Sequence, residues 1–68
     1  MCRSIKRLRE GADVVPDTEI REAALQYVRK VSGFREPSGR HREAFERAVD
    51  QVAVSSKDLL EAIARELA

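Results

Sequence analysis

Residues 37–68 decide the fold of this chain, and they read PSGRHREAFERAVDQVAVSSKDLLEAIARELA. Beyond Gly39 the stretch contains neither proline nor glycine, and its apolar residues recur every three or four positions, as in an amphipathic helix. These apolar positions are Ala44, Phe45, Ala48, Val49, Val52, Leu59, Leu60, Ile63, Ala64 and Leu67. Ser38 is a suitable N-cap. We predict one long helix over about 39–67, about 45 Å in length at about 1.5 Å per residue.

A shorter helix over about 18–32 precedes the long one. Its apolar stripe consists of Ile20, Ala23, Ala24, Tyr27, Val28 and Val31. Asp17 or Thr18 is expected to cap its start, and Gly33 can end it in a left-handed conformation. Because a short turn makes neighbouring helices antiparallel, we predict an all-α helical hairpin over 17–68. Residues 1–16 are interpreted as an arm and linker, and the chain (1–68) as a single small domain.

The two predicted helices differ in length, which leaves part of the long helix uncovered. The first covers only about 22 Å of the second at about 1.5 Å per residue. The apolar residues beyond its reach are Leu59, Leu60, Ile63 and Leu67. The N-terminal arm, a bend at Val54-Ser55-Ser56 or a second copy of the protein could cover them. We favour the second copy, so the hairpin is expected to be completed as a homodimer.

Composition narrows the class of protein. Cys2 is the single cysteine among 68 residues, so a disulfide framework is excluded. The basic N-terminus lacks the apolar region of a secretory signal, and no apolar run approaches the length of a membrane span. The sequence therefore predicts a cytoplasmic protein without a membrane partner.

Cations gather where the two helices are predicted to meet. Arg40 and Arg42 lie in the first turn of the long helix, where positive charge opposes the helix dipole. A bound anion would reverse that cost, because free backbone N–H groups and guanidiniums would converge on it. The alternative is a solvated basic loop that Glu43 and Glu46 partly neutralise. The candidate ligand-binding residues are Ser38, Arg35, Arg40, His41 and Arg42.

From this cluster of cations we predict a helical binding module whose ligand is an anionic small molecule or an acidic protein partner. Nucleic acid is disfavoured as the partner, because the chain contains only three aromatic residues, Tyr27, Phe34 and Phe45. At least two of these belong to the predicted core, so they cannot form a platform on which bases stack.

Cys2 carries the alternative function, a very small enzyme or metal-binding protein. Removal of Met1 would expose an α-amine beside the thiol, and Arg3 and its basic neighbours would favour the thiolate nucleophile. Cys2 and Arg3 are then the catalytic candidates. A soft metal ion at Cys2, with His41 as a further ligand, is the one cofactor that this reading allows. The simpler interpretation is that Cys2 is a small packed hydrophobe.

The chain also resembles a small bacterial family known only as a domain of unknown function. The segments that carry the resemblance are Met1-Cys2-Arg3 with Ile5-Lys6, the run from Ala23 to Gly33, and Pro37-Ser38 followed by Ala44-Phe45 and Ala48-Val49. The sequence departs from the family pattern at His41, where asparagine is usual, and in residues 11–16, where a Phe-x-Pro-Pro stretch is usual. The resemblance implies a bacterial, soluble, helical protein and brings no activity.

Overall fold

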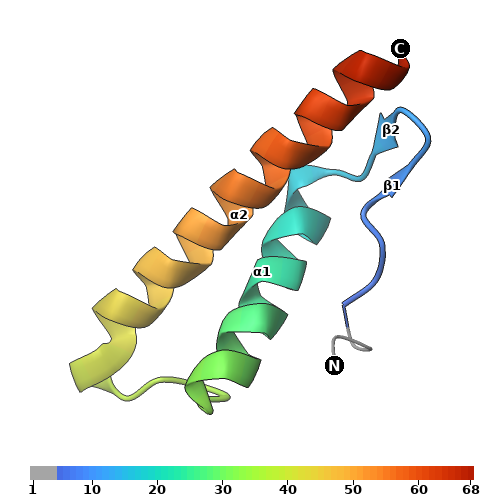
Figure 1. Cartoon of the computed structure of the whole chain (residues 1–68). Coiled ribbons are helices and arrows are strands. Elements are labelled where there is room, and N and C mark those ends of the chain that lie inside the picture. Colours follow the sequence, from blue (N-terminus) through green and yellow to red (C-terminus); the bar gives the residue numbers. More distant parts are fainter. Residues whose placement is uncertain (1–4) are drawn as a thin grey trace.

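Two antiparallel helices form the body of the protein, as predicted (Figure 1). This computed structural model describes residues 5–68. Helix α1 spans Asp17–Ser32 and helix α2 spans Gly39–Leu67. Two short strands, β1 (Arg9–Glu10) and β2 (Asp13–Val14), precede the helices and pair with each other. The strand pair is an addition that the sequence analysis did not predict.

The two ends of α1 follow different rules. Pro16 is the N-cap, in an extended conformation, and its carbonyl accepts hydrogen bonds from the backbone N–H groups of Glu19 and Ile20 at 3.0 and 3.2 Å. The predicted cap at Asp17 or Thr18 is therefore wrong: Asp17 is the first helical residue. At the other end Gly33 has φ 79°, and its N–H bonds to the carbonyl of Arg29 at 3.0 Å, as predicted.

Helix α2 is continuous over its 29 residues, so the bend considered at Val54-Ser55-Ser56 is absent. Ser38 occupies the predicted N-cap position with extended backbone angles, but its side chain makes no capping hydrogen bond. Its carbonyl instead accepts the N–H of His41 at 3.0 Å.

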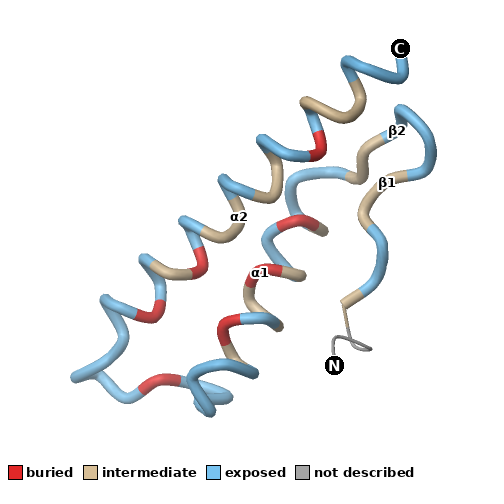
Figure 2. Tube along the Cα trace, viewed as in Figure 1, coloured by how far each residue is buried: buried red, intermediate tan, exposed pale blue. Residues whose placement is uncertain are grey.

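The core lies along the interface between the two helices (Figure 2). Ala24 and Val28 of α1 are buried in one cluster with Phe45 and Val49 of α2. Partly buried side chains extend this cluster along both helices: Leu25, Ala48, Val52 and Ala53. The buried parts of the two predicted stripes thus face each other, which fixes the register of the hairpin. The prediction is wrong for Tyr27 and Val31, which are 44% and 64% exposed because they lie to the side of the helix interface.

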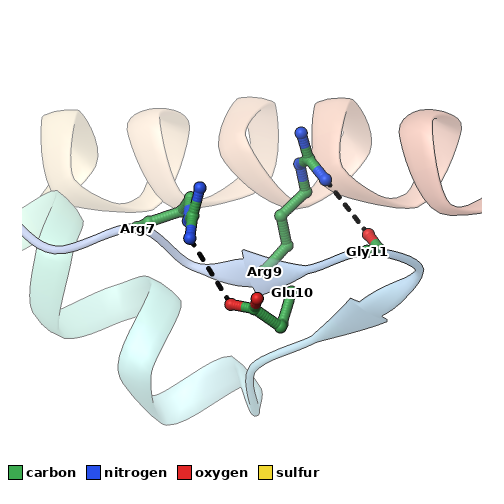
Figure 3. Close-up of polar contacts among 4 residues, drawn as sticks. All are labelled: Arg7, Arg9, Glu10 and Gly11. Atoms are coloured by element: carbon green, nitrogen blue, oxygen red, sulfur yellow. Dashed lines mark hydrogen bonds and ion pairs between the residues drawn. The ribbon is translucent and has the colours of Figure 1, made fainter.

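The segment interpreted as a linker instead forms most of a small β-hairpin, in which Arg9 pairs with Val14 and Glu10 with Asp13. Gly11 has φ 60° and no other residue between the strands has a positive φ, which identifies a type II′ turn with glycine at its first central position. Figure 3 shows that the Arg9 guanidinium donates to the carbonyl of Gly11 at 3.1 Å. In the same view Arg7 reaches Glu10 at 3.5 Å.

This β-hairpin covers part of α2 that α1 does not reach. Lys57 contacts Asp17, the first residue of α1, at 3.0 Å, so α2 beyond Lys57 runs past the start of α1. Strand β2 packs against α2 (Figure 1), and Leu60 is only 9% exposed. Of the three covers considered, the N-terminal arm is the one seen. Leu59 and Leu67 remain 60% and 55% exposed, and the homodimer stays a prediction.

No helix within residues 5–68 combines the length and apolarity that crossing a membrane requires.

We expect Leu60→Ala to lower the free energy of unfolding by about 2–5 kcal/mol, because it empties a buried site. The matched control Leu59→Ala removes a neighbouring exposed leucine and should change it by no more than about 0.5 kcal/mol. Urea denaturation at two protein concentrations measures both. If both variants lowered the free energy of unfolding by similar amounts, and these decreases became smaller at the lower protein concentration, the result would contradict this explanation and favour the homodimer.

We expect Gly33→Ala to destabilise the protein by about 1–2 kcal/mol, because an L side chain is disfavoured in the left-handed region. A Cβ at Gly33 or at Gly39 meets nothing within 4 Å, so the two positions differ in backbone conformation and not in space. Gly39→Ala should therefore be neutral or stabilising, by up to about 1 kcal/mol. Thermal unfolding of both variants compares them, and equal shifts would refute this explanation.

Candidate functional site

An open groove of ≈ 400 Å³ lies between α1 and α2 and ends at the loop that connects them. We call it the basic groove. Its lining residues are Thr18, Arg21, Glu22, Leu25, Arg29, Arg35, Glu36, Pro37, Arg42, Phe45, Glu46 and Val49. Four of these are arginines, and they come from both helices and from the loop.

The helical repeat places the side chains of the basic groove. Arg21, Leu25 and Arg29 recur every four residues, so they lie along one side of α1. On α2, Phe45 and Val49 have the same spacing and belong to the core cluster. The groove therefore has an apolar floor, made by Leu25, Phe45 and Val49, and charged walls.

Toward the start of α1, cations on one helix meet carboxylates on the other. Arg21 donates to Asp50 at 2.6 Å and Lys57 donates to Asp17 at 3.0 Å. The hydrogen bond with Asp17 and its negative charge raise the pKa of Lys57 above the ordinary value of 10.5, against a small opposing effect of desolvation. In this part of the hairpin the charges are matched across the helix interface.

At the loop end, three arginines and the two carboxylates of Glu36 and Glu46 line the groove. Arg29 comes from α1, Arg42 from α2 and Arg35 from the loop between them. Among residues 5–68, no carboxylate lies within salt-bridge distance of Arg29 or Arg35. Arg42 reaches Glu46 of its own helix at 3.9 Å. We call Arg29, Arg35 and Arg42 the arginine triad.

Hydrogen bonds to the loop hold two members of the triad in place. Arg29 Nε donates to the carbonyl of Arg35 at 3.0 Å, and Arg42 Nη2 donates to the carbonyl of Pro37 at 3.4 Å. These acceptors are uncharged, so the bonds hold the guanidiniums without neutralising them, and the only ion pair that either forms within residues 5–68 is that of Arg42 with Glu46 of its own helix.

The structure divides the five candidate ligand-binding residues into two groups. Arg35 and Arg42 line the basic groove. Ser38, Arg40 and His41 are exposed and are not among its lining residues. The ring of His41 stacks on that of Phe34, with centroids 5.4 Å apart, so His41 has a packing contact.

The candidates of the Cys2-centred alternative, Cys2 and Arg3, lie outside the described residues. Within residues 5–68, no group of three His, Cys, Asp or Glu side chains is placed to hold a metal ion. Glu43, the carboxylate nearest to His41 along the chain, pairs with Arg47 at 3.6 Å.

Arg21 and Arg29 were not among the candidates from the sequence. Their spacing in the sequence could have indicated that they share a face, since residues four and eight positions apart lie on one side of a helix. Their proximity to Arg42 depends on the register between the helices, which the packing of the core determines.

A second hollow of ≈ 410 Å³ adjoins the basic groove on the outer side of the loop. Arg29 and Arg35 line both hollows, and Phe34 lines the second. The two arginines thus border both hollows, of which one has an apolar floor and the other an aromatic ring among its lining residues.

The fold and the groove define a small helical-hairpin protein with an N-terminal β-hairpin and a basic loop end. The chain belongs to the family described as an uncharacterised conserved protein family, DUF2277, whose model matches residues 1–67. This agrees with the resemblance to a domain of unknown function. Comparison with curated proteins and with solved structures found no match.

We expect Asp17→Asn to move the pKa of Lys57 down toward 10.5, because the variant removes the charge that raises it. A raised pKa stabilises the folded state below the unfolded value of Lys57, and this contribution is lost as the pH rises through the folded value. An NMR titration of the Lys57 Cε signal measures the pKa. Asp50→Asn is the control, since Asp50 pairs with Arg21, and an equal effect from both variants would contradict the assignment.

Proposed function

We propose that this protein is a binding module that holds an anionic group in the basic groove, at the arginine triad. One observation carries the proposal: ion pairs join the two helices near the start of α1, whereas at the loop end no ion pair of residues 5–68 joins the helices or reaches Arg29 or Arg35. An anion between α1 and α2 would supply the missing negative charge.

The charge of the surrounding segment supports this site. Residues 29–42 contain five Lys or Arg residues and one carboxylate, Glu36, whereas the whole chain has 13 cations and 12 acids. The first turn of α2 has no acidic residue, although acids are favoured there. Positive charge is thus concentrated at the loop end far beyond its share of the composition.

The chemistry of guanidinium suits the proposed role. Arginine binds carboxylate or phosphate oxygens through two parallel N–H···O bonds, which gives geometric selectivity as well as affinity. Because the loop carbonyls already hold Arg29 and Arg42, less side-chain entropy is lost when an anion binds. The triad is therefore partly preorganised.

We also propose that the protein acts in the bacterial cytoplasm. Its single cysteine suits a reducing compartment, and its resemblance is to a bacterial family.

We expect sulfate or phosphate to raise the melting temperature more than chloride does at matched ionic strength. An anion at ten times its Kd stabilises the folded state by about 1.4 kcal/mol, and each kcal/mol shifts the Tm of a domain this size by about 4–8 °C. The double variant Arg35→Gln/Arg42→Gln should lose this increment. Differential scanning calorimetry gives the measurement.

The control is Arg47→Gln/Arg65→Gln, which removes the same charge from residues that do not line the basic groove. Sulfate also stabilises proteins by exclusion from their surface, and that part should persist in both double variants. Equal sulfate and chloride responses in the unmodified protein, or equal losses in the two double variants, would overturn the proposal.

A further inference from the structure

We infer that the anionic group is a carboxylate of a short acidic segment of another protein, and that an apolar side chain of the same segment enters the basic groove. This inference rests on the proposed function and adds the class of partner to it. Three observations carry it: the apolar floor, the second hollow and the extent of the positive surface.

The apolar floor distinguishes the groove from a site for a free inorganic anion. Leu25, Phe45 and Val49 lie between the arginines of the two walls. Phosphate or sulfate gains nothing from such a floor, whereas an apolar side chain loses unfavourable contact with water there. Phe45 and Val49 are already 8% and 3% exposed, so the floor suits one or two side chains and not a broad apolar surface.

The second hollow indicates how long a segment of the partner the site can hold. It shares Arg29 and Arg35 with the basic groove and brings Phe34 to its own wall. From Arg21 to Gly33 the helix rises about 18 Å at about 1.5 Å per residue, which equals five or six extended residues at about 3.3 Å each. A segment of that length reaches both hollows and places a carboxylate at the arginines between them.

The positive surface continues outside the groove. Lys30 and Arg40 are exposed and lie within two residues of Arg29 and Arg42 in the sequence, and no carboxylate of residues 5–68 lies within salt-bridge distance of either. One bound anion would neutralise only part of this charge. A segment with several acidic side chains complements the whole loop end, and such complementarity both orients a partner and accelerates its association.

Other anionic macromolecules fit the surface less well. Phe45 is buried and Phe34 is already stacked on His41, so Tyr27, which is 44% exposed, is the one Phe or Tyr ring left for the bases of a single-stranded nucleic acid, too few for a stacking platform. The apolar floor lies at the bottom of a groove between cations, and a flat lipid headgroup surface does not reach it. A polypeptide can present a carboxylate and an apolar side chain close together, as the arginines and the apolar floor of the groove require.

Fluorescence anisotropy with labelled six-residue peptides tests the inference. Each peptide carries four glutamates and a Leu-Phe pair, and the panel moves the pair through every position; a second panel has Ser-Ser in its place. The best Leu-Phe peptide should bind at least about tenfold more tightly than any Ser-Ser peptide of equal charge, through the added apolar burial. Arg35→Gln/Arg42→Gln should weaken it at least about tenfold, and Arg47→Gln/Arg65→Gln should not.

The other outcomes separate this inference from the proposed function. If phosphate raises the melting temperature through the triad but the two panels bind equally, the partner class is wrong and the anion site remains. If neither phosphate nor any peptide responds to the triad variants, both fail. Tighter binding of an oligouridylate or of phosphatidylglycerol vesicles than of every peptide would also overturn the inference, in favour of that partner.

Discussion

The packing of Ala24 and Val28 against Phe45 and Val49 is the contact on which the rest of the structure depends. A chain of 68 residues buries a modest fraction of its surface, so this one cluster supplies most of the order between the helices. Once these side chains meet, the relative position of every other residue on the two helices follows. Lys57 comes to lie beside Asp17, and the two-helix interface ends there.

The same register explains why charge is distributed unevenly in a chain whose net charge is only +1. In the half of the hairpin away from the loop, ion pairs join the helices, and in each pair a carboxylate of one helix neutralises a cation of the other. At the loop the arginines bond to uncharged carbonyls, so they order the connection and remain fully cationic. One type of residue thus orders the loop and supplies the positive charge of the proposed binding site.

Periodicity predicted both helices, their antiparallel arrangement and the glycine that ends α1, because each of these follows from local sequence. The start of α1 was misplaced because Pro16 caps through its backbone carbonyl, which a search for side-chain caps overlooks. The β-hairpin was missed because its strands have two residues each, too short for any alternation. Arg35 and Arg42, predicted from the sequence as ligand-binding candidates, line the groove, whereas Arg21 and Arg29 join them only through tertiary packing.

The position of the β-hairpin against the far part of α2 also sets an order of assembly. The core side chains near the loop are close in sequence, whereas the contact of Asp17 with Lys57 spans 40 residues. Closing a longer loop costs more entropy. We therefore expect the helix contacts nearest the loop to form first during folding and the N-terminal segment to dock last. Because this segment is held by few buried side chains, it is also the first part to open. We therefore expect backbone amides of β1 and β2 to exchange with solvent ahead of those in the helical core, and the part of α2 that β2 contacts to become exposed at each opening.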